Sequence, residues 1–95
     1  MSRTYDEVVA ERRSRLDPDA IAKGEMLAQA YSIAMQVVEL REKHGLTQTQ
    51  LAVRCGVSQS DISRIERGST SPTARTLQRI ADALDADVRL VARGA

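Results

Sequence analysis

The residue types that commonly carry out catalysis or hold metals are sparse in this sequence. It has one histidine, His44, and one cysteine, Cys55, and neither has a second ligand or a base spaced near it. Without a nucleophile and base pair, or clustered carboxylates, the sequence predicts no enzyme, no metal site and no other cofactor. We interpret His44 as a cation near a helix end and Cys55 as a small core residue.

The segment from Thr47 to Gly68 carries the clearest local signals in the chain. Thr47 is followed three residues later by Gln50, a capping box that predicts a helix from about Gln48. The apolar residues after it recur at the spacing of one helical face, and Gly56 suits the left-handed backbone conformation that ends a helix. The sequence therefore predicts a short helix that stops at a glycine turn.

A second short helix is expected directly after this turn. Ser58 and Asp61 repeat the capping pattern, Ile62 and Ile65 give the helix one apolar face, and Gly68 suits the position that closes it. Two short capped helices around a glycine turn are typical of the helix-turn-helix, which lays its second helix, the recognition helix, into the major groove of DNA.

A long helix is predicted before this motif, from about Pro18 to about Lys43. Asp17 can cap its start, and Pro18 suits the first helical position. A bend is expected at Gly24, because glycine weakens a helix by about 1 kcal/mol relative to alanine. The helix carries two apolar stripes, which are Leu27, Tyr31, Ala34 and Val38, and Ile33, Val37 and Leu40. Because this is too much apolar surface for one contact, the earlier part of the helix is expected to need a partner surface.

The region after the motif is predicted to form a last helix and then a strand. Thr73 can cap the helix, whose inward residues are Leu77, Ile80, Ala81 and Leu84. From Asp87 to Arg93 the sequence alternates as in a strand. Since no other strand is predicted, we expect this one to pair, through Val88 and Leu90, with the same strand of a second copy in an antiparallel homodimer. Such a dimer would place two recognition helices about 34 Å apart, facing a palindromic DNA site.

In these motifs the chain resembles the phage-repressor type of helix-turn-helix protein, known as the XRE family. The resemblance covers roughly Val37 to Leu90, and its specific parts, in order along the chain, are GLTQTQLA, CGVSQ, ISRIERG and PTARTLQRIADALDADVRL. It implies an all-α fold: a five-helix repressor-type domain, here with an N-terminal helical extension and one C-terminal strand that pairs across the dimer. Many family members carry glycine where this chain has Asp85, so the last helix is expected to end with some strain.

The same resemblance implies roles for individual side chains. The groove-facing residues of the recognition helix are Gln59, Ser60 and Arg64, and side chains of these types can hydrogen-bond to base edges. The residues expected at DNA phosphates are Gln48, Ser63, Arg67, Ser69, Thr70 and Ser71, although the three loop hydroxyls could equally be ordinary solvated loop residues. Asp61 could accept from a cytosine amino group, but we favour a role as a first-turn helix charge.

The resemblance also implies a structural ion pair between Arg41, late in the long helix, and Glu66, near the end of the recognition helix. Such a pair would fix one helix against the other. If it is buried, losing one partner should cost about 3 to 5 kcal/mol, because the other charge stays stranded. Arg41 is therefore assigned to structure rather than to DNA.

The net charge of +1 is unevenly divided along the 95 residues. Residues 1–40 hold five basic and seven acidic groups, residues 41–79 hold seven and three, and residues 80–95 hold two and three. The basic excess coincides with the motif, although a merely solvated charged face would look the same by counting. The length suits one small domain, and the lack of a long apolar run or a signal peptide favours a cytoplasmic protein without a membrane span.

The first residues predict a short amphipathic helix, because a capping box from Thr4 to Glu7 precedes apolar residues at helical spacing. The chain thus has a helical extension at residues 1–36 and a repressor-type domain at residues 37–95, which ends in a strand. In this order of parts it is similar to the HigA-type antitoxins. In that family the protein neutralises a RelE-like ribonuclease toxin and represses its own operon. The toxin-contact candidates are Tyr5, Val8, Val9, Leu16, Leu27 and Tyr31. These residues could instead pack on the protein's own helices, or residues 1–16 could be disordered.

The alternative function is a stand-alone XRE-family transcriptional repressor that answers to no partner protein. A third interpretation is an interaction scaffold that has lost DNA binding, because a fold does not guarantee its usual function. The presence of Gln48, Gln59 and Arg64 argues against the scaffold on chemical grounds.

Overall fold

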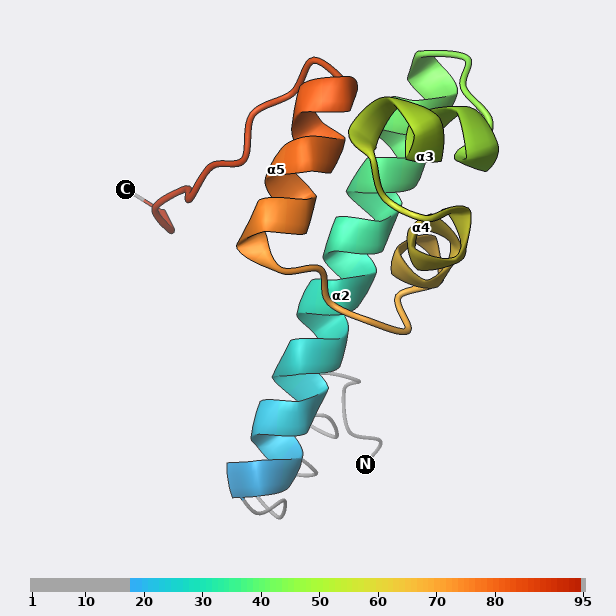
Figure 1. Ribbon diagram of the computed structural model, residues 1–95. Helices are drawn as coiled ribbons and strands as arrows, with labels where there is room; N and C mark the ends of the chain where they lie inside the picture. The colour runs from blue at the N-terminus through green and yellow to red at the C-terminus, as the bar shows by residue number, and fades with distance from the viewer. Residues whose placement is uncertain (1–17, 95) are drawn as a thin grey trace, which may run out of the picture.

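The structure is a computed structural model that describes residues 18–94. Four helices make up this part of the chain: α2 (Pro18–Lys43), α3 (Gln48–Cys55), α4 (Gln59–Glu66) and α5 (Ala74–Ala83). The three short helices gather around the C-terminal half of α2, while its N-terminal half projects away from them (Figure 1). The described chain is therefore a small helical body from which the N-terminal half of α2 extends.

The helix-turn-helix pair forms where its capping residues predict it. Before α3, the Thr47 hydroxyl accepts from the Gln50 backbone N–H at 3.1 Å, and the Gln50 side chain accepts from the Thr47 N–H at 2.9 Å. The helix ends at Gly56, whose φ of 69° lies in the left-handed region that glycine adopts without strain. The predicted capping box and glycine turn are therefore confirmed.

The other two short helices begin in the same way. The Ser58 hydroxyl accepts from the Asp61 N–H at 3.1 Å, and the Thr73 hydroxyl accepts from the Thr76 N–H at 3.2 Å. Asp85, just after α5, has a φ of 51°, a conformation that costs a non-glycine residue some strain. The irregular end expected for the last helix is thus present.

The core lies where α3, α4 and α5 meet the C-terminal half of α2. Its largest fully buried side chains are Leu51, Ile62, Ile80 and Leu84. Ala52 and Cys55 close the space between the helices of the motif, and both are less than a tenth exposed. No polar or charged residue is classed as buried between residues 18 and 94. The apolar periodicities of the sequence therefore converge on one core, and Cys55 belongs to it as expected.

The long helix forms over its predicted range, Pro18–Lys43. The helix α2 continues through Gly24 without interruption, so the expected bend does not break it. A Cβ at Gly24 would meet nothing within 4 Å, which places the position in open space. None of the helices in residues 18–94 is long and apolar enough to cross a membrane.

Two parts of the expected fold are not supported by residues 18–94. The segment from Asp87 to Arg93 is not a strand, because within one copy no neighbouring backbone is available to pair with it. Leu90, expected on the packed side of that strand, is fully exposed. The count of five helices is not supported either: residues 18–94 form four, and after Asp85 the chain is irregular. The short helix expected near Tyr5 lies outside the described residues.

Candidate nucleic-acid interface

The outward face of α4 is polar and slightly hollowed. Ile62 and Ile65 point into the core, which turns the opposite side of the helix to solvent. That side forms one shallow depression, lined by Gln59, Ser60, Ser63, Arg64 and Arg67. All three residues predicted to contact bases, and two of those predicted to contact phosphates, therefore share one surface. Their amide, hydroxyl and guanidinium groups are the types that hydrogen-bond to base edges and phosphates.

Arg64 is held on this face by a neighbour on its own helix. Its Nη2 forms an ion pair with Oδ1 of Asp61, one helical turn earlier. The pKa of Asp61 is lowered, first by the hydrogen bond from Arg64 and then by the one involving Ser58. Asp61 therefore acts as a first-turn charge with a partner on the same helix, in line with the favoured role. It also restrains the direction of the Arg64 guanidinium.

Other polar groups around the end of α4 are also engaged. Arg67 donates from Nη1 to the Ser63 hydroxyl at 3.0 Å, one turn earlier. The Ser69 hydroxyl donates to the backbone carbonyl of Arg64 at 3.0 Å. The Ser69 hydroxyl proton is therefore used in capping the end of α4. Thr70 and Ser71, the next two residues, are exposed. Of the three loop hydroxyls, Ser69 is the least available to donate to a phosphate.

The expected ion pair between Arg41 and Glu66 is formed. Arg41 Nε lies 2.7 Å from Glu66 Oε2, and Arg41 Nη2 lies 2.9 Å from Oε1, so the contact is bidentate. Arg41 Nη1 also donates to the Leu46 carbonyl at 2.8 Å. The side chains are 15% and 4% exposed. The hydrogen bonds to Glu66 raise the pKa of Arg41, against the opposing effect of burial.

Gln48 has a role in this structure that the sequence did not predict. Its Nε2 donates to Glu66 Oε1 at 3.2 Å, and its Oε1 accepts from Gln59 Nε2 at 3.2 Å. The side chain therefore links the ion pair to the first residue of the recognition helix. Gln48 begins α3, Gln59 begins α4 and Glu66 ends α4. Their spacing in the sequence does not predict that these three side chains meet.

Residues 37–91 of the chain match the sequence family described as Helix-turn-helix. This chain belongs to the helix-turn-helix family. It is of the XRE type that its motifs predict. The match covers the end of α2 from residue 37, the three short helices and most of the following segment.

This helix-turn-helix protein is similar in sequence to an antitoxin and to a transcriptional regulator. It is 37% identical over 75 residues to "Antitoxin HigA1" from Mycobacterium tuberculosis, which covers 79% of this chain and 50% of that protein. It is 40% identical over 52 residues to an "Uncharacterized HTH-type transcriptional regulator", y4dJ, from Sinorhizobium fredii, covering 55% of this chain and 68% of that one. The chain thus spans about half the length of HigA1.

Two solved structures share the fold. One is an "HTH_3 family Transcriptional Regulator" from Vibrio cholerae, with a TM-score of 0.63 and 39% identity over 65% of this chain and 35% of that one. The other is a chain of a "Toxin-Antitoxin module" from Streptococcus pneumoniae, with a TM-score of 0.61 and 26% identity. The second likeness extends over 99% of this chain and 97% of that one. It therefore includes the projecting part of α2 as well as the helix-turn-helix body.

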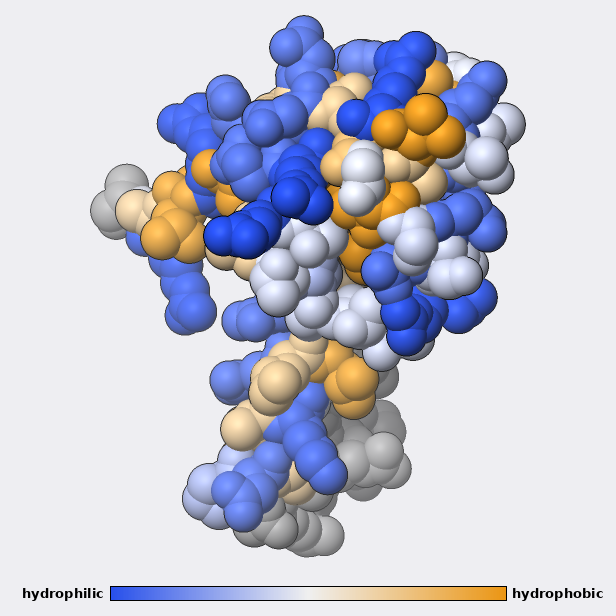
Figure 2. Space-filling model, viewed as in Figure 1, coloured by the Kyte–Doolittle hydropathy of each residue, from blue (hydrophilic) through white to orange (hydrophobic). Residues whose placement is uncertain are grey.

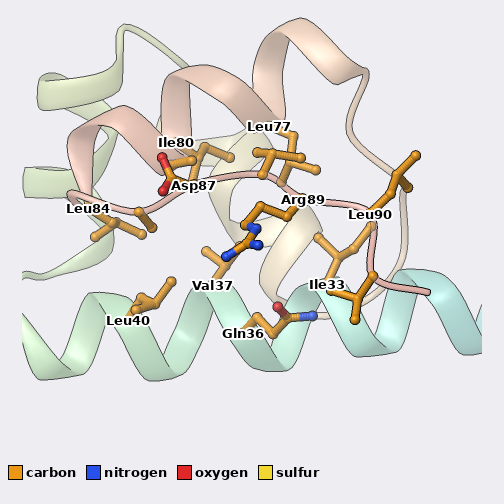
Figure 3. Close-up of a pocket in the computed structure, with 14 residues that line it drawn as sticks. Ile33, Gln36, Val37, Leu40, Leu77, Ile80, Leu84, Asp87, Arg89 and Leu90 are labelled. Atoms are coloured by element: carbon orange, nitrogen blue, oxygen red, sulfur yellow. The ribbon is translucent and has the colours of Figure 1, made fainter. Parts of the chain in front are cut away.

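An apolar groove lies on the helix-turn-helix body between α2 and α5. Figure 3 shows Ile33, Val37 and Leu40 from α2 facing Leu77 and Ile80 from α5 and Leu84 just after it, with the C-terminal segment running alongside. That segment exposes the apolar side chains of Val88, Leu90 and Val91. Both residues predicted to mediate dimerisation, Val88 and Leu90, therefore line the groove and remain accessible in the single copy.

The middle of α2 exposes a second apolar surface, which we call the α2 ridge. It consists of Leu27, Tyr31 and Met35, whose exposed fractions are 67%, 64% and 43%, while Met26, 64% exposed, lies about 100° around the helix from Leu27. Figure 2 shows apolar side chains among hydrophilic ones on the projecting part of the molecule. Leu27 and Tyr31 were predicted as partner contacts. Met26 and Met35 were missed, although Leu27, Tyr31 and Met35 follow each other at four-residue spacing.

The remaining toxin-contact candidates lie outside the described residues. These are Tyr5, Val8, Val9 and Leu16. Within residues 18–94 no group of three or more His, Cys, Asp or Glu side chains is arranged to hold a metal ion. Cys55 is buried, with its Sγ 3.8 Å from the Ala52 carbonyl oxygen.

Proposed function

We propose that this protein is a sequence-specific DNA-binding antitoxin that represses its own operon and neutralises a RelE-like ribonuclease toxin. The observation that carries the DNA-binding part is the depression on α4, whose five lining residues are all able to hydrogen-bond to DNA. Likeness to HigA1 and to a chain of a toxin–antitoxin module supports the antitoxin part.

In the proposed complex, α4 lies in the major groove of a duplex. Gln59, Ser60 and Arg64 contact base edges, because all three lie on the exposed side of the helix, the first two at its N-terminal end and Arg64 in its last turn. The phosphate contacts fall to Gln48, Ser63, Arg67, Ser69, Thr70 and Ser71, of which Ser63 and Arg67 line the depression and Ser69 is the least available to donate. The seven basic and three acidic groups of residues 41–79 supply the long-range attraction.

We further propose that two copies bind a palindromic operator as a homodimer. Val88 and Leu90 are accessible beside the apolar groove, and the backbone of their segment is not part of a sheet within one copy. Pairing the two C-terminal segments in antiparallel fashion would satisfy both backbones and cover the apolar side chains. The segment would then become a strand on dimerisation, with the recognition helices about 34 Å apart.

The experiment for the dimer is analytical ultracentrifugation of Leu90→Asp beside the wild-type protein. We expect the wild type to sediment as a dimer and Leu90→Asp as a monomer. Val53→Asp is the matched control, because Val53 is equally apolar and is 79% exposed on α3. A monomeric wild type, or a Leu90→Asp protein that stays dimeric, would contradict the proposed interface.

The α2 ridge is the proposed toxin-binding surface, together with the apolar residues of the extension that precedes it. In this division residues 1–36 bind the toxin and residues 37–95 bind DNA and the second copy. A ridge of large apolar side chains that are 43% to 67% exposed is costly to leave in water, and it lies away from the DNA-facing side of α4. Leu27 and Tyr31 are the central contacts, and Tyr5, Val8, Val9 and Leu16 extend them.

Co-expression with the small protein encoded next to this gene tests the toxin part. We expect the two to co-purify and this protein to block ribonuclease activity of its partner. Leu27→Ala with Tyr31→Ala should weaken that complex, whereas Gln29→Ala, exposed on a different side of α2, should not. If no neighbour binds while operator binding persists, the stand-alone repressor is the better function, as the likeness to y4dJ would then suggest.

A further inference from the structure

The backbone from Asp87 to Arg93 is open to pairing with another chain. Along residues 18–94 the last backbone hydrogen bond runs from the Ala86 N–H to the Ala81 carbonyl, and the backbone groups that follow have no partner in the described chain. Such unpaired N–H and C=O groups are a template for pairing with a second chain. The segment runs along the apolar groove between α2 and α5 (Figure 3), so a second copy paired with it would lie beside this groove.

The charged side chains of this segment are also without partners in the described chain. In a strand over this segment, Val88, Leu90 and Ala92 would share one side, and the other side would carry Asp87, Arg89, Val91 and Arg93. None of the three charged side chains forms an ion pair within residues 18–94. One acidic and two basic groups are therefore available on one side of the segment.

These charges discriminate between the ways in which two copies can pair. In an antiparallel pair related by a two-fold axis, residues equally far from the axis lie opposite each other. With the axis at Leu90, Asp87 of each copy lies opposite Arg93 of the second copy. An axis at Arg89 would instead bring the two Arg89 side chains together, and an axis at Val91 would place Arg89 opposite Arg93. Like charges directly opposite each other destabilise a strand pair, so both of these registers are disfavoured.

An axis at Val88 is disfavoured by the backbone that precedes the segment. It would pair Asp87 with Arg89, which are opposite charges, but it would also align the chain before Asp87 with the rest of the second copy's segment. That chain is not available as a strand, because Asp85 has a left-handed φ of 51° and the Ala86 N–H is already hydrogen-bonded. Only the axis at Leu90 uses the whole open backbone and pairs opposite charges at both ends.

We infer that two copies of this chain pair their C-terminal segments about a two-fold axis at Leu90, with Asp87 of each copy forming an ion pair with Arg93 of the second. The two Leu90 side chains then meet at the axis, and each Val88 lies opposite Ala92 of the second copy. The apolar residues of both segments thus gather on one side of the pair. This inference rests on the proposed homodimer and assigns its register.

The first test exchanges the charges and measures the dimer dissociation constant by sedimentation. We expect Asp87→Arg and Arg93→Asp each to raise this constant about tenfold or more, because like charges then lie opposite at both ends of the pair. The double variant Asp87→Arg/Arg93→Asp restores opposite charges and should return it to within about threefold of the wild type.

The matched control is Asp87→Arg/Arg89→Asp, which has the same net charge as the wild type and as the first double variant. In the inferred register it leaves arginines opposite each other at residues 87 and 93, so it should not restore the dimer. Restoration by Arg89→Asp rather than by Arg93→Asp, or no weakening by either single reversal, would overturn the register.

The second test locates the axis with a single introduced cysteine in each variant. Mild oxidation should cross-link Leu90→Cys, because the two thiols lie opposite each other at the axis. In Val88→Cys and Arg89→Cys the equivalent Cα atoms would be about 8 Å apart or more, beyond the span of a disulfide. The wild type, whose Cys55 is buried, is the control for background cross-linking.

The position that cross-links fastest separates the possible outcomes. Faster cross-linking of Val88→Cys or Arg89→Cys than of Leu90→Cys would overturn the inferred register while leaving a strand-paired dimer. A monomeric wild type would instead refute the proposed homodimer, and the register with it.

Discussion

Arg41 and Glu66 join the long helix to the end of the recognition helix through a bidentate contact, with N–O distances of 2.7 and 2.9 Å. The pair lies 25 residues apart in sequence and is mostly withdrawn from water, with side chains 15% and 4% exposed. It fixes the position of α4 against α2, and it is also linked through Gln48 to Gln59.

Removing one member of this pair should destabilise the fold strongly. We expect Glu66→Ala to lower the free energy of unfolding by about 3 to 5 kcal/mol, because Arg41 would be left without its partner in a mostly buried site. Urea denaturation measures the change. Glu39→Ala, an exposed carboxylate on the same long helix, should stay within about 0.5 kcal/mol of the wild type. A loss below 1 kcal/mol for Glu66→Ala would show that the pair contributes little.

Ala52 should tolerate no larger side chain. It is 6% exposed and packs in the core beside Leu51 and Cys55, where α3 meets the other helices. We expect Ala52→Leu to cost about 1 to 3 kcal/mol or more through overpacking, enough to unfold so small a domain at moderate temperature. Thermal unfolding followed by circular dichroism is the measurement. Val53→Leu, at the neighbouring exposed position, should melt near the wild type.

Arg64 and Arg67 should differ in the kind of defect they cause. We expect Arg64→Ala to relax the preference at one base pair at a cost of about 1 to 3 kcal/mol. Arg67→Ala should weaken binding to all sequences and reduce the slope of log K against log salt by about one unit. Binding titrations at several salt concentrations on matched and mismatched duplexes separate the two effects. Intact sequence preference in Arg64→Ala would show that this guanidinium does not read bases.

Asp61 should titrate below the usual range of an aspartate. Its pKa is lowered first by the hydrogen bond from Arg64 and then by the one involving Ser58. Because the folded-state pKa is depressed, the contact is fully present above the ordinary aspartate pKa of about 3.9 and is lost as pH falls through the lower value. NMR titration of the Asp61 carboxyl should show Arg64→Ala moving its pKa upward toward the ordinary value. No movement would mean that Arg64 is not its main partner.

The capping residues were the most reliable guide to this fold. Thr47, Ser58 and Thr73 act through amides three residues away, and Gly56 acts through its own backbone, so local sequence contains the information. Even the strain at Asp85 follows from residue type and position. These features fix where three of the four described helices begin and how the turn is made.

Features that depend on distant partners were harder to predict. Alternation after Asp87 suggested a strand, but a strand exists only where another backbone pairs with it, and a single copy offers none. Gln48 was expected at a phosphate, yet its amide meets Glu66 and Gln59, which only the packing of α3 on α4 brings together. Met35 was overlooked because the sequence alone does not show which apolar residues of a long helix stay exposed after the other helices pack against it.

The central claim is that the polar outward face of α4 binds DNA. The most direct test is ¹H–¹⁵N mapping of the full-length protein while a duplex carrying its own upstream region is added at low salt. We predict that the largest shifts fall on the α4 residues lining the depression and on the start of α3, and that the projecting half of α2 stays unchanged. Saturable binding with no shifts in α4, or with shifts confined to the α2 ridge, would contradict the account.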